Sequence, residues 1–70
     1  MNQDMRNNLA RNIKKLREAR ALRREELSLL LGFDNSYISK IEKARLNATI
    51  DKLAKIADYF EIKIAELFEE

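Results

Sequence analysis

The chain of 70 residues has no cysteine, histidine, proline or tryptophan, and its one glycine is Gly32. Disulfides, zinc sites built on thiolates or imidazoles, and histidine-based catalysis are therefore excluded. No apolar run reaches the roughly 20 residues that span a bilayer, and the first residues lack the apolar stretch of a signal peptide. We expect a cytoplasmic chain with no membrane contact, stabilised by packing or by a partner chain.

The sequence also lacks a catalytic constellation. Its acidic pairs, Glu25 with Glu26 and Glu69 with Glu70, are neighbours in sequence, and no nucleophile or base accompanies them. We therefore expect no enzymatic activity, and no cofactor, metal ion or small-molecule ligand.

The charges are unevenly distributed along the chain. Residues 1–45 contain 11 Lys and Arg against 6 Asp and Glu, whereas residues 46–70 contain 3 against 6. The net charges are +5 and −3, so only the first two thirds of the chain suit a polyanion such as nucleic acid. The alternative is that these charges simply coat helix surfaces.

The spacing of apolar residues predicts an all-α fold in a single domain, residues 1–70 with a core of about 7–68. Leu, Ala, Ile and long charged side chains dominate the composition and favour helices. Five helices are expected: about Asn7 to Arg20, Arg24 to Leu31, a third capped by Asp34, a fourth from the cap Thr49 to Phe60, and a short fifth containing Ile64, Leu67 and Phe68.

The second and third predicted helices form a helix-turn-helix signature. Gly32 can end the second helix because it adopts a left-handed conformation without steric cost. Asp34 can cap the third helix only two residues later. Two short helices joined by a tight, glycine-containing turn are typical of this motif.

The third helix carries the candidate DNA-reading residues. If Ile38 and Ile41 dock it on the core, its polar side chains face outward, where they suit base edges in a major groove. The predicted base contacts are Asn35, Ser36, Tyr37, Ser39 and Lys40. Cations around them are expected to meet phosphates, namely Arg23, Arg24, Lys43 and Arg45. An ordinary solvated helix face remains the alternative.

Residues 9–68 resemble, almost end to end, the Cro/C1-type (XRE) helix-turn-helix family of transcriptional regulators. The resemblance rests on RNIKKLREAR, EELSLLLGF and SYISKIEKARLNATIDKLAKIADYFEIKIAELF, whose motifs align in order without a gap. It implies a five-helix, lambda-repressor-like DNA-binding domain with helices 2 and 3 as the helix-turn-helix. It also implies a homodimer on a palindromic operator, with half-sites about one DNA turn apart, roughly 34 Å.

The resemblance assigns further residues. It places Arg24 where the family usually has a phosphate-binding Gln, adds Asn47 to the phosphate contacts, and matches Arg17 and Glu42 to an ion pair inside the fold. In some members, acids on helix two touch RNA polymerase, so Glu25 and Glu26 are candidate polymerase contacts. Carboxylates at a helix N-terminus are also favoured by electrostatics alone.

Within the family, YISKIE followed by NATI is most similar to small controller proteins of restriction-modification systems. The implied function is a sequence-specific regulator of transcription that acts on its own promoter, as repressor or activator. Phage-type repressors and antitoxin-type modules that act mainly through a protein partner share the architecture and remain alternatives.

Several positions depart from the family pattern. Arg23 replaces the usual polar cap, Ala44 and Glu61 replace glycines, and Ala48 replaces a proline. Because Ala costs about 1 kcal/mol more than Gly in a left-handed conformation, we expect the third helix to continue through Ala44.

Two apolar sets lack an obvious place in one small core. Leu29 and Leu30 stand where the family usually has charged residues. They either pack partly against the first helix, or are ordinary surface leucines, or form a patch for a protein partner. The C-terminal third holds more apolar surface than two short helices need, which predicts a two-fold dimer interface. Its expected residues are Tyr59, Ile62, Ile64, Leu67 and Phe68.

Overall fold

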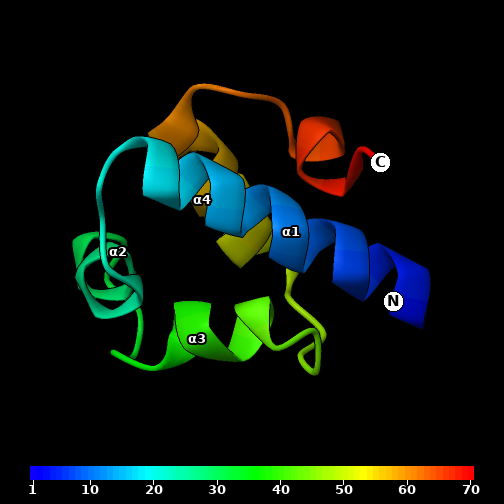
Figure 1. Cartoon of the computed structure of the whole chain (residues 1–70), viewed down its shortest axis with the longest axis horizontal. Coiled ribbons are helices and arrows are strands. Elements are labelled where there is room, and N and C mark those ends of the chain that lie inside the picture. Colours follow the sequence, from blue (N-terminus) through cyan, green and yellow to red (C-terminus); the bar gives the residue numbers. More distant parts are fainter.

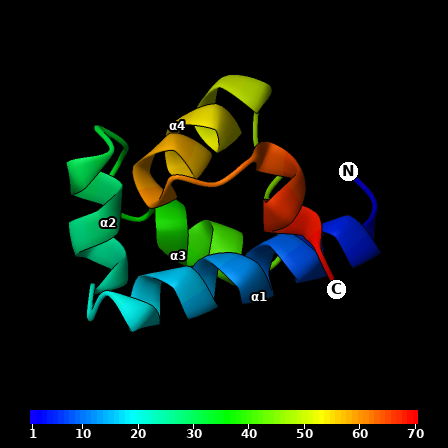
Figure 2. The same cartoon turned by 90° about the horizontal axis from the view of Figure 1, so that it is seen from above.

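The computed structural model describes all 70 residues, as four α-helices followed by a short 3-10 helix. The elements are α1 (Gln3–Ala19), α2 (Arg24–Leu30), α3 (Tyr37–Glu42), α4 (Ile50–Phe60) and η1 (Ile64–Phe68). The longest helix, α1, packs against α3 and η1, while α2 packs against α3 and α4 against η1 (Figure 1). Seen from above, α2 lies at one end of the molecule and both termini lie at the other (Figure 2). None of the helices combines the length and the apolar character needed to cross a membrane.

The structure differs from the expected helices in the type of the fifth helix and in the start of the first. The expected fifth α-helix is a 3-10 helix, in which Glu66 N donates to Lys63 O (3.0 Å). A 3-10 helix has i to i+3 bonds and is typically used in short pieces such as this one of five residues. The first helix begins at Gln3 rather than Asn7 because Asn2 caps it, its Oδ1 accepting from Met5 N at 2.8 Å.

One apolar cluster joins all five elements. The predicted stripe of α1 is buried at Leu9 and Ile13, and the predicted docking residues of α3 are buried at Ile38 and Ile41. These four side chains are at most 2% exposed, so the periodicity located the core face of both helices correctly. The full cluster is Leu9, Ile13, Leu27, Phe33, Tyr37, Ile38, Ile41, Leu53, Ile56, Ala57, Phe60 and Leu67.

The expected helix ends at Gly32 and Thr49 are confirmed. Gly32 has φ = 75°, the left-handed conformation, two residues after the end of α2. Thr49 Oγ1 accepts from Lys52 N at 3.2 Å and so caps α4. Each cap residue therefore fixes where a neighbouring helix stops or starts.

The start of α2 is capped from within the helix. Arg23 has no side chain that can accept a hydrogen bond there, but the carboxylate of Glu26 reaches back and accepts from Arg23 N at 2.9 Å. This is one half of a capping box, and it compensates for the missing polar cap.

A buried serine that the sequence analysis missed joins α2 to α3. Ser28 is fully buried; its hydroxyl donates to Arg24 O (2.9 Å) and accepts from Ile38 N (3.0 Å). The first bond lies within α2 and the second crosses to the first turn of α3. Ser28 therefore helps to set how α3 is held against α2.

The expected continuation of α3 through Ala44 is wrong. The helix ends at Glu42, and Ala44 has φ = 58°, as does Glu61 after α4. Ala44 N donates to Ile41 O at 2.9 Å, and Gln3 Nε2 donates to Ala44 O at 3.0 Å. The bond from α1, which the local sequence does not reveal, helps to hold the turn despite its unfavourable conformation.

Replacing Ala44 by glycine should raise the free energy of unfolding by about 1 kcal/mol, because glycine adopts positive φ without steric cost. Urea denaturation of the purified protein measures this change. The matched control is Ala54→Gly inside α4, which should lower stability by about 1 kcal/mol. A loss of stability in both variants would contradict the left-handed conformation at Ala44.

Replacing Ser28 by alanine should lower the free energy of unfolding by about 1–3 kcal/mol, because the amide of Ile38 is left buried without an acceptor. Ser39→Ala on α3 is the control, since the Ser39 side chain makes no hydrogen bond within the chain. Equal unfolding midpoints for the two variants would argue against the Ser28 bridge.

Candidate nucleic-acid interface

Four of the five predicted base contacts lie on the solvent side of α3 or in the turn that leads into it. Asn35 and Lys40 are exposed, and Ser36 and Ser39 are half-buried. Because Ile38 and Ile41 are turned into the core, these four polar side chains border the solvent side of the helix. The expected division of α3 into a core face and a solvent face is therefore confirmed. The base contacts themselves stay predictions.

The expected exposure of Tyr37 is wrong. Its side chain is only 8% exposed and packs edge-on against Phe33, with ring centroids 4.8 Å apart. The ammonium of Lys52 lies 4.4 Å from the ring centroid, and burial raises the pKa of the Tyr37 hydroxyl. The hydroxyl has no partner within the chain, yet no buried polar atom is unpaired, so it reaches the surface. Only this hydroxyl, and not the ring, is available to DNA.

Asp34 organises the turn before α3 rather than occupying the N-cap position, which Ser36 holds. Its Oδ2 accepts from the hydroxyl of Ser36 and from Ser36 N, the latter at 3.2 Å. These hydrogen bonds, the hydroxyl one first, lower the pKa of Asp34 below its ordinary value. The Ser36 hydroxyl thus donates its hydrogen to Asp34, and its oxygen can act only as an acceptor toward solvent.

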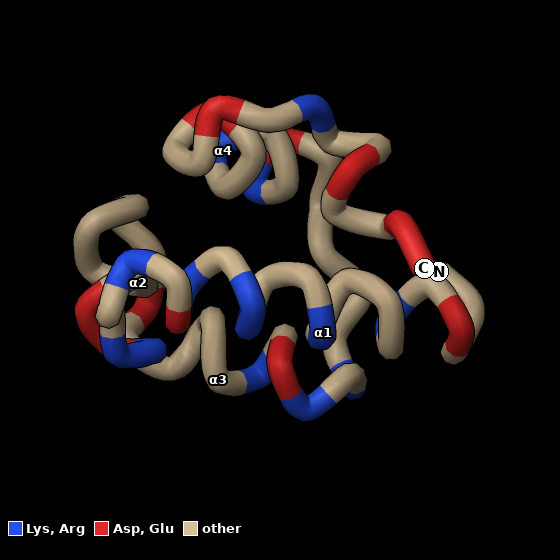
Figure 3. The backbone as a smooth tube through the Cα atoms, turned by 45° about the horizontal axis from the view of Figure 1, so that its top comes forward, with Lys and Arg blue, Asp and Glu red and all other residues tan.

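Two surface grooves bring the predicted cations together beside α3. One is lined by Lys40, Lys43, Arg45 and Leu46. The other lies where α1, α2 and α3 meet and shares Lys43; its lining is Lys14, Arg24, Ser39, Glu42 and Lys43. Lys and Arg occur along α1, α2 and α3 on this side, while the C-terminal end carries acids (Figure 3). Two predicted base contacts and three predicted phosphate contacts therefore border one continuous cationic surface.

The predicted ion pair between Arg17 and Glu42 is present. Arg17 Nε lies 2.7 Å from Glu42 Oε2 and Nη2 lies 3.1 Å from Oε1, with side chains only 8% and 5% exposed. Arg17 Nη1 also donates to Leu22 O at 2.6 Å. The hydrogen bonds to Glu42 raise the pKa of Arg17, and the buried carboxylate is neutralised.

Glu42 also holds Arg24, a predicted phosphate contact. Arg24 Nε donates to Glu42 Oε1 at 3.0 Å, and the side chain of Arg24 stays 52% exposed. The two terminal nitrogens of its guanidinium make no hydrogen bond within the chain. Arg24 is therefore held at one edge and open at the other.

Arg23 is not part of the cationic surface. Its guanidinium is paired with the Glu26 carboxylate (3.2 Å), and it lines a different groove with Glu25, Glu26 and Leu29. The hydrogen bonds from Arg23, first from its backbone N–H and then from its side chain, lower the pKa of Glu26. Phosphate contact by Arg23 stays a prediction, and Glu26 has a structural role in capping α2.

The loop after α3 is tied to the first turns of α1. Arg6 Nη1 donates to Asn47 Oδ1 at 2.6 Å, and Gln3 holds the carbonyl of Ala44. Asn47 and Arg45 are exposed. The loop expected to follow the DNA backbone is thus supported by Gln3 and Arg6, which the sequence analysis left outside the domain core.

One of the five residues expected at the dimer interface is buried in the core of the monomer. Leu67 is fully buried, because η1 packs against α1, so it is not available to a partner. The remaining four, Tyr59, Ile62, Ile64 and Phe68, are half-buried and pack against the core from its edge. The apolar surplus of the C-terminal third is therefore smaller than its composition indicated.

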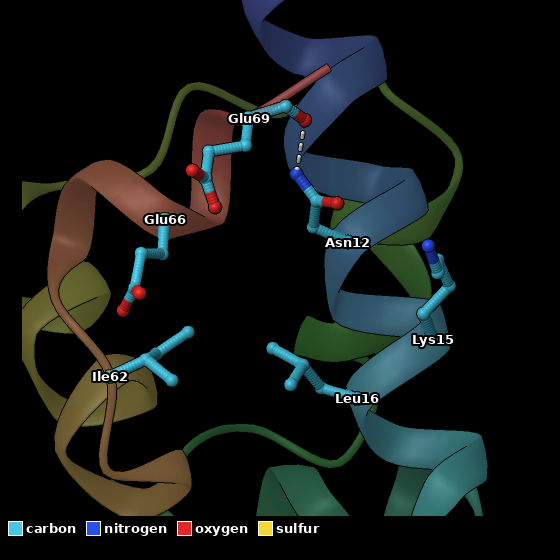
Figure 4. Close-up of a pocket in the computed structure, with 6 residues that line it drawn as sticks. All are labelled: Asn12, Lys15, Leu16, Ile62, Glu66 and Glu69. Carbon is cyan, nitrogen blue, oxygen red and sulfur yellow. Dashed lines mark hydrogen bonds between the residues drawn. The ribbon is translucent and has the colours of Figure 1, made fainter.

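A groove between α1 and the C-terminal segment borders this region (Figure 4). Leu16 and Ile62 point toward one another across it, while Lys15 points away. Asn12 Nδ2 donates to Glu69 O at 2.7 Å and to Leu67 O at 2.9 Å, which fastens the C-terminal segment to α1.

Leu29 and Leu30 are 58% and 59% exposed, which rules out burial against α1 and leaves an ordinary surface leucine or a partner patch. With Glu26 they line a shallow apolar groove on the outer side of α2. Single exposed leucines are common on protein surfaces, so a protein partner at this patch stays a prediction.

Comparison with known proteins identifies the family. The helix-turn-helix family matches residues 13–67, which include α2, α3 and α4. A helix-turn-helix-type transcriptional regulator of Sinorhizobium fredii, y4dJ, is 33% identical over 64 residues, covering 91% of this chain and 83% of that protein.

Two crystal structures are similar in fold and sequence. The hypothetical transcription factor NHTF from Neisseria superimposes with a TM-score of 0.88 at 30% identity, over 96% of this chain and 77% of that one. The restriction-modification controller protein C.AhdI from Aeromonas hydrophila gives a TM-score of 0.80 at 30% identity, over 90% and 96%. The chain belongs to the Cro/C1-type (XRE) family of DNA-binding helix-turn-helix transcriptional regulators.

Proposed function

We propose that the chain is a sequence-specific regulator that binds a palindromic operator as a homodimer and controls its own promoter. The observation that carries this proposal is the cationic surface, where Ser39 and Lys40 of α3 lie among Arg24, Lys43 and Arg45. The similarity to a restriction-modification controller protein supports a role of the same kind.

Base contacts would read the DNA sequence, and phosphate contacts would position the protein on the duplex. Asn35, Ser36, Ser39 and Lys40 offer donors and acceptors to base edges in the major groove, and the ammonium of Lys40 suits the O6 and N7 atoms of guanine. Arg45 and Asn47 would follow the backbone on one side of α3 and Arg24 on the other, while Lys43 lines both grooves. Arg23 can add a contact if its exposed guanidinium leaves Glu26.

The homodimer would form through the half-buried edge of the C-terminal third. Tyr59, Ile62, Ile64 and Phe68 retain partial exposure there. Because the four residues already contribute to the monomer core, the interface would be small and dimerisation would depend on concentration. Control by the protein's own concentration follows from such a weak, two-fold association.

Action through a protein partner is the second candidate, as in antitoxin-type modules. The exposure of Leu29 and Leu30 on α2 favours it. Contact with RNA polymerase through Glu25 and Glu26 stays a prediction; of these two, Glu26 already serves as the cap of α2.

Selection from a random duplex pool should enrich a palindrome whose half-sites lie about 10 base pairs apart. Lys40→Ala should weaken binding to the selected duplex by about 1–3 kcal/mol and relax the sequence preference at one position of each half-site. Fluorescence anisotropy with labelled duplexes measures both effects.

The control for Lys40 is Lys63→Ala, which removes the same charge from the acidic C-terminal third. Enrichment of no sequence, or binding that depends on salt but not on sequence, would contradict the operator proposal. The second candidate function, contact with a protein partner through Leu29 and Leu30, would then be favoured.

Ile62→Glu should convert the dimer to a monomer, because it places a carboxylate in the proposed apolar interface. Sedimentation equilibrium at micromolar concentration should show the dimer for the parent protein and the monomer for the variant. Leu30→Glu, an equally drastic change at an exposed leucine of α2, should leave the dimer intact. A parent protein that sediments as a monomer would overturn the homodimer.

A further inference from the structure

The groove where α1, α2 and α3 meet contains Lys14, to which the proposed function assigns no contact with DNA. Its lining has no apolar side chain and consists of Lys14, Arg24, Ser39, Glu42 and Lys43. Of these, Lys14 comes from the middle of α1, a helix that otherwise serves the core. It is exposed, and it forms no ion pair within 4 Å.

The groove has an excess of positive charge despite Glu42. The carboxylate of Glu42 is neutralised by the buried guanidinium of Arg17, through bonds of 2.7 and 3.1 Å. Lys14, Arg24 and Lys43 are therefore left as three cations without a full counter-charge. A small polar groove with three cations suits an anion with several oxygens.

Glu42 also orients the cation at the α2 side of the groove. It accepts from Arg24 Nε at 3.0 Å, while both terminal nitrogens of Arg24 have no partner. A guanidinium fixed at one edge offers its other donors in a defined direction, and paired N–H donors match two oxygens of one phosphate. The hydroxyl of Ser39 lines the same groove and can donate to a third oxygen.

We propose that Lys14, Arg24, Ser39 and Lys43 form a binding site for one backbone phosphate of the DNA, with Glu42 as the positioning residue for Arg24. This inference rests on the proposed function and deepens it, because α1 becomes part of the DNA surface. The phosphate belongs to the strand that borders the major groove next to Lys40, since Ser39 and Lys40 are consecutive in α3. The site reads no base, so it adds affinity without changing sequence preference.

The test compares Lys14→Ala with Lys15→Ala, which removes the same charge from the next residue on α1. Binding of the parent and both variants to the selected duplex and to a scrambled duplex is measured across a salt series. Lys14→Ala should weaken both duplexes by similar factors. It should reduce the slope of log K against log salt by up to about 0.9 for each protomer, because Arg24 and Lys43 then neutralise the shared phosphate less completely.

Lys15→Ala should leave that slope near the parent value. Equal slopes for the two variants, whether both fall or neither does, would overturn the phosphate site. A parent protein that binds neither duplex would overturn the proposed function itself, so the two failures are distinguishable. Thermal unfolding of both variants should match the parent, since neither side chain forms an ion pair within the chain.

A methylphosphonate scan of the selected duplex locates the phosphate. Neutralising the phosphate that occupies the groove should weaken binding by the parent and by Lys15→Ala. The same neutral linkage should have a smaller effect on Lys14→Ala or on Arg24→Ala, because these variants hold that phosphate with one cation fewer. Full sensitivity of Lys14→Ala at every position would contradict the shared site.

Discussion

The arrangement of α1, α2 and α3 depends on the buried pair of Arg17 and Glu42. Both side chains are almost out of water, where an unpaired charge would be costly, so the three hydrogen bonds of Arg17 to Glu42 and Leu22 O must all form together. The pair links α1 to the last turn of α3, and Arg24 extends the link to α2. A rotation of α3 relative to α1 would break it, so the pair fixes how α3 is presented.

Ser28 supplies the matching constraint at the other end of α3. It accepts from Ile38 N in the first turn, whereas Glu42 lies in the last turn. A helix of six residues has little stability of its own, so its shape comes from these two attachments and from the burial of Ile38 and Ile41. A helix held at both ends needs little reordering when it enters a groove, which reduces the entropic cost of binding.

Periodicity and cap residues predicted the parts of this structure that depend on local sequence. Ile38 with Ile41 located the core face of α3, and Gly32 and Thr49 located helix ends.

The errors of the sequence analysis lie where residues far apart in the chain decide the local structure. Ala44 adopts the left-handed conformation in a turn whose carbonyl is held by Gln3, 41 positions away in the chain. Leu67 is buried because η1 packs on α1. Tyr37 was assigned to the polar face although an aromatic side chain in a first turn can equally extend a core, as it does beside Phe33. Lys14 lines a groove with Arg24 and Lys43, a position that the linear sequence does not reveal.

Pairing, rather than the number of charges, determines the field beside α3. The first 45 residues contain six acids, yet two of those nearest the motif are paired with arginines: Glu42 with Arg17 and Arg24, and Glu26 with Arg23. Lys14, Lys40, Lys43 and Arg45 form no ion pair within the chain. The acids that remain free lie largely in the C-terminal third, away from α3 (Figure 3). A net charge of only +2 can therefore coexist with a cationic surface, because Glu42 and Glu26 are paired with arginines while Lys14, Lys40, Lys43 and Arg45 have no ion-pair partner.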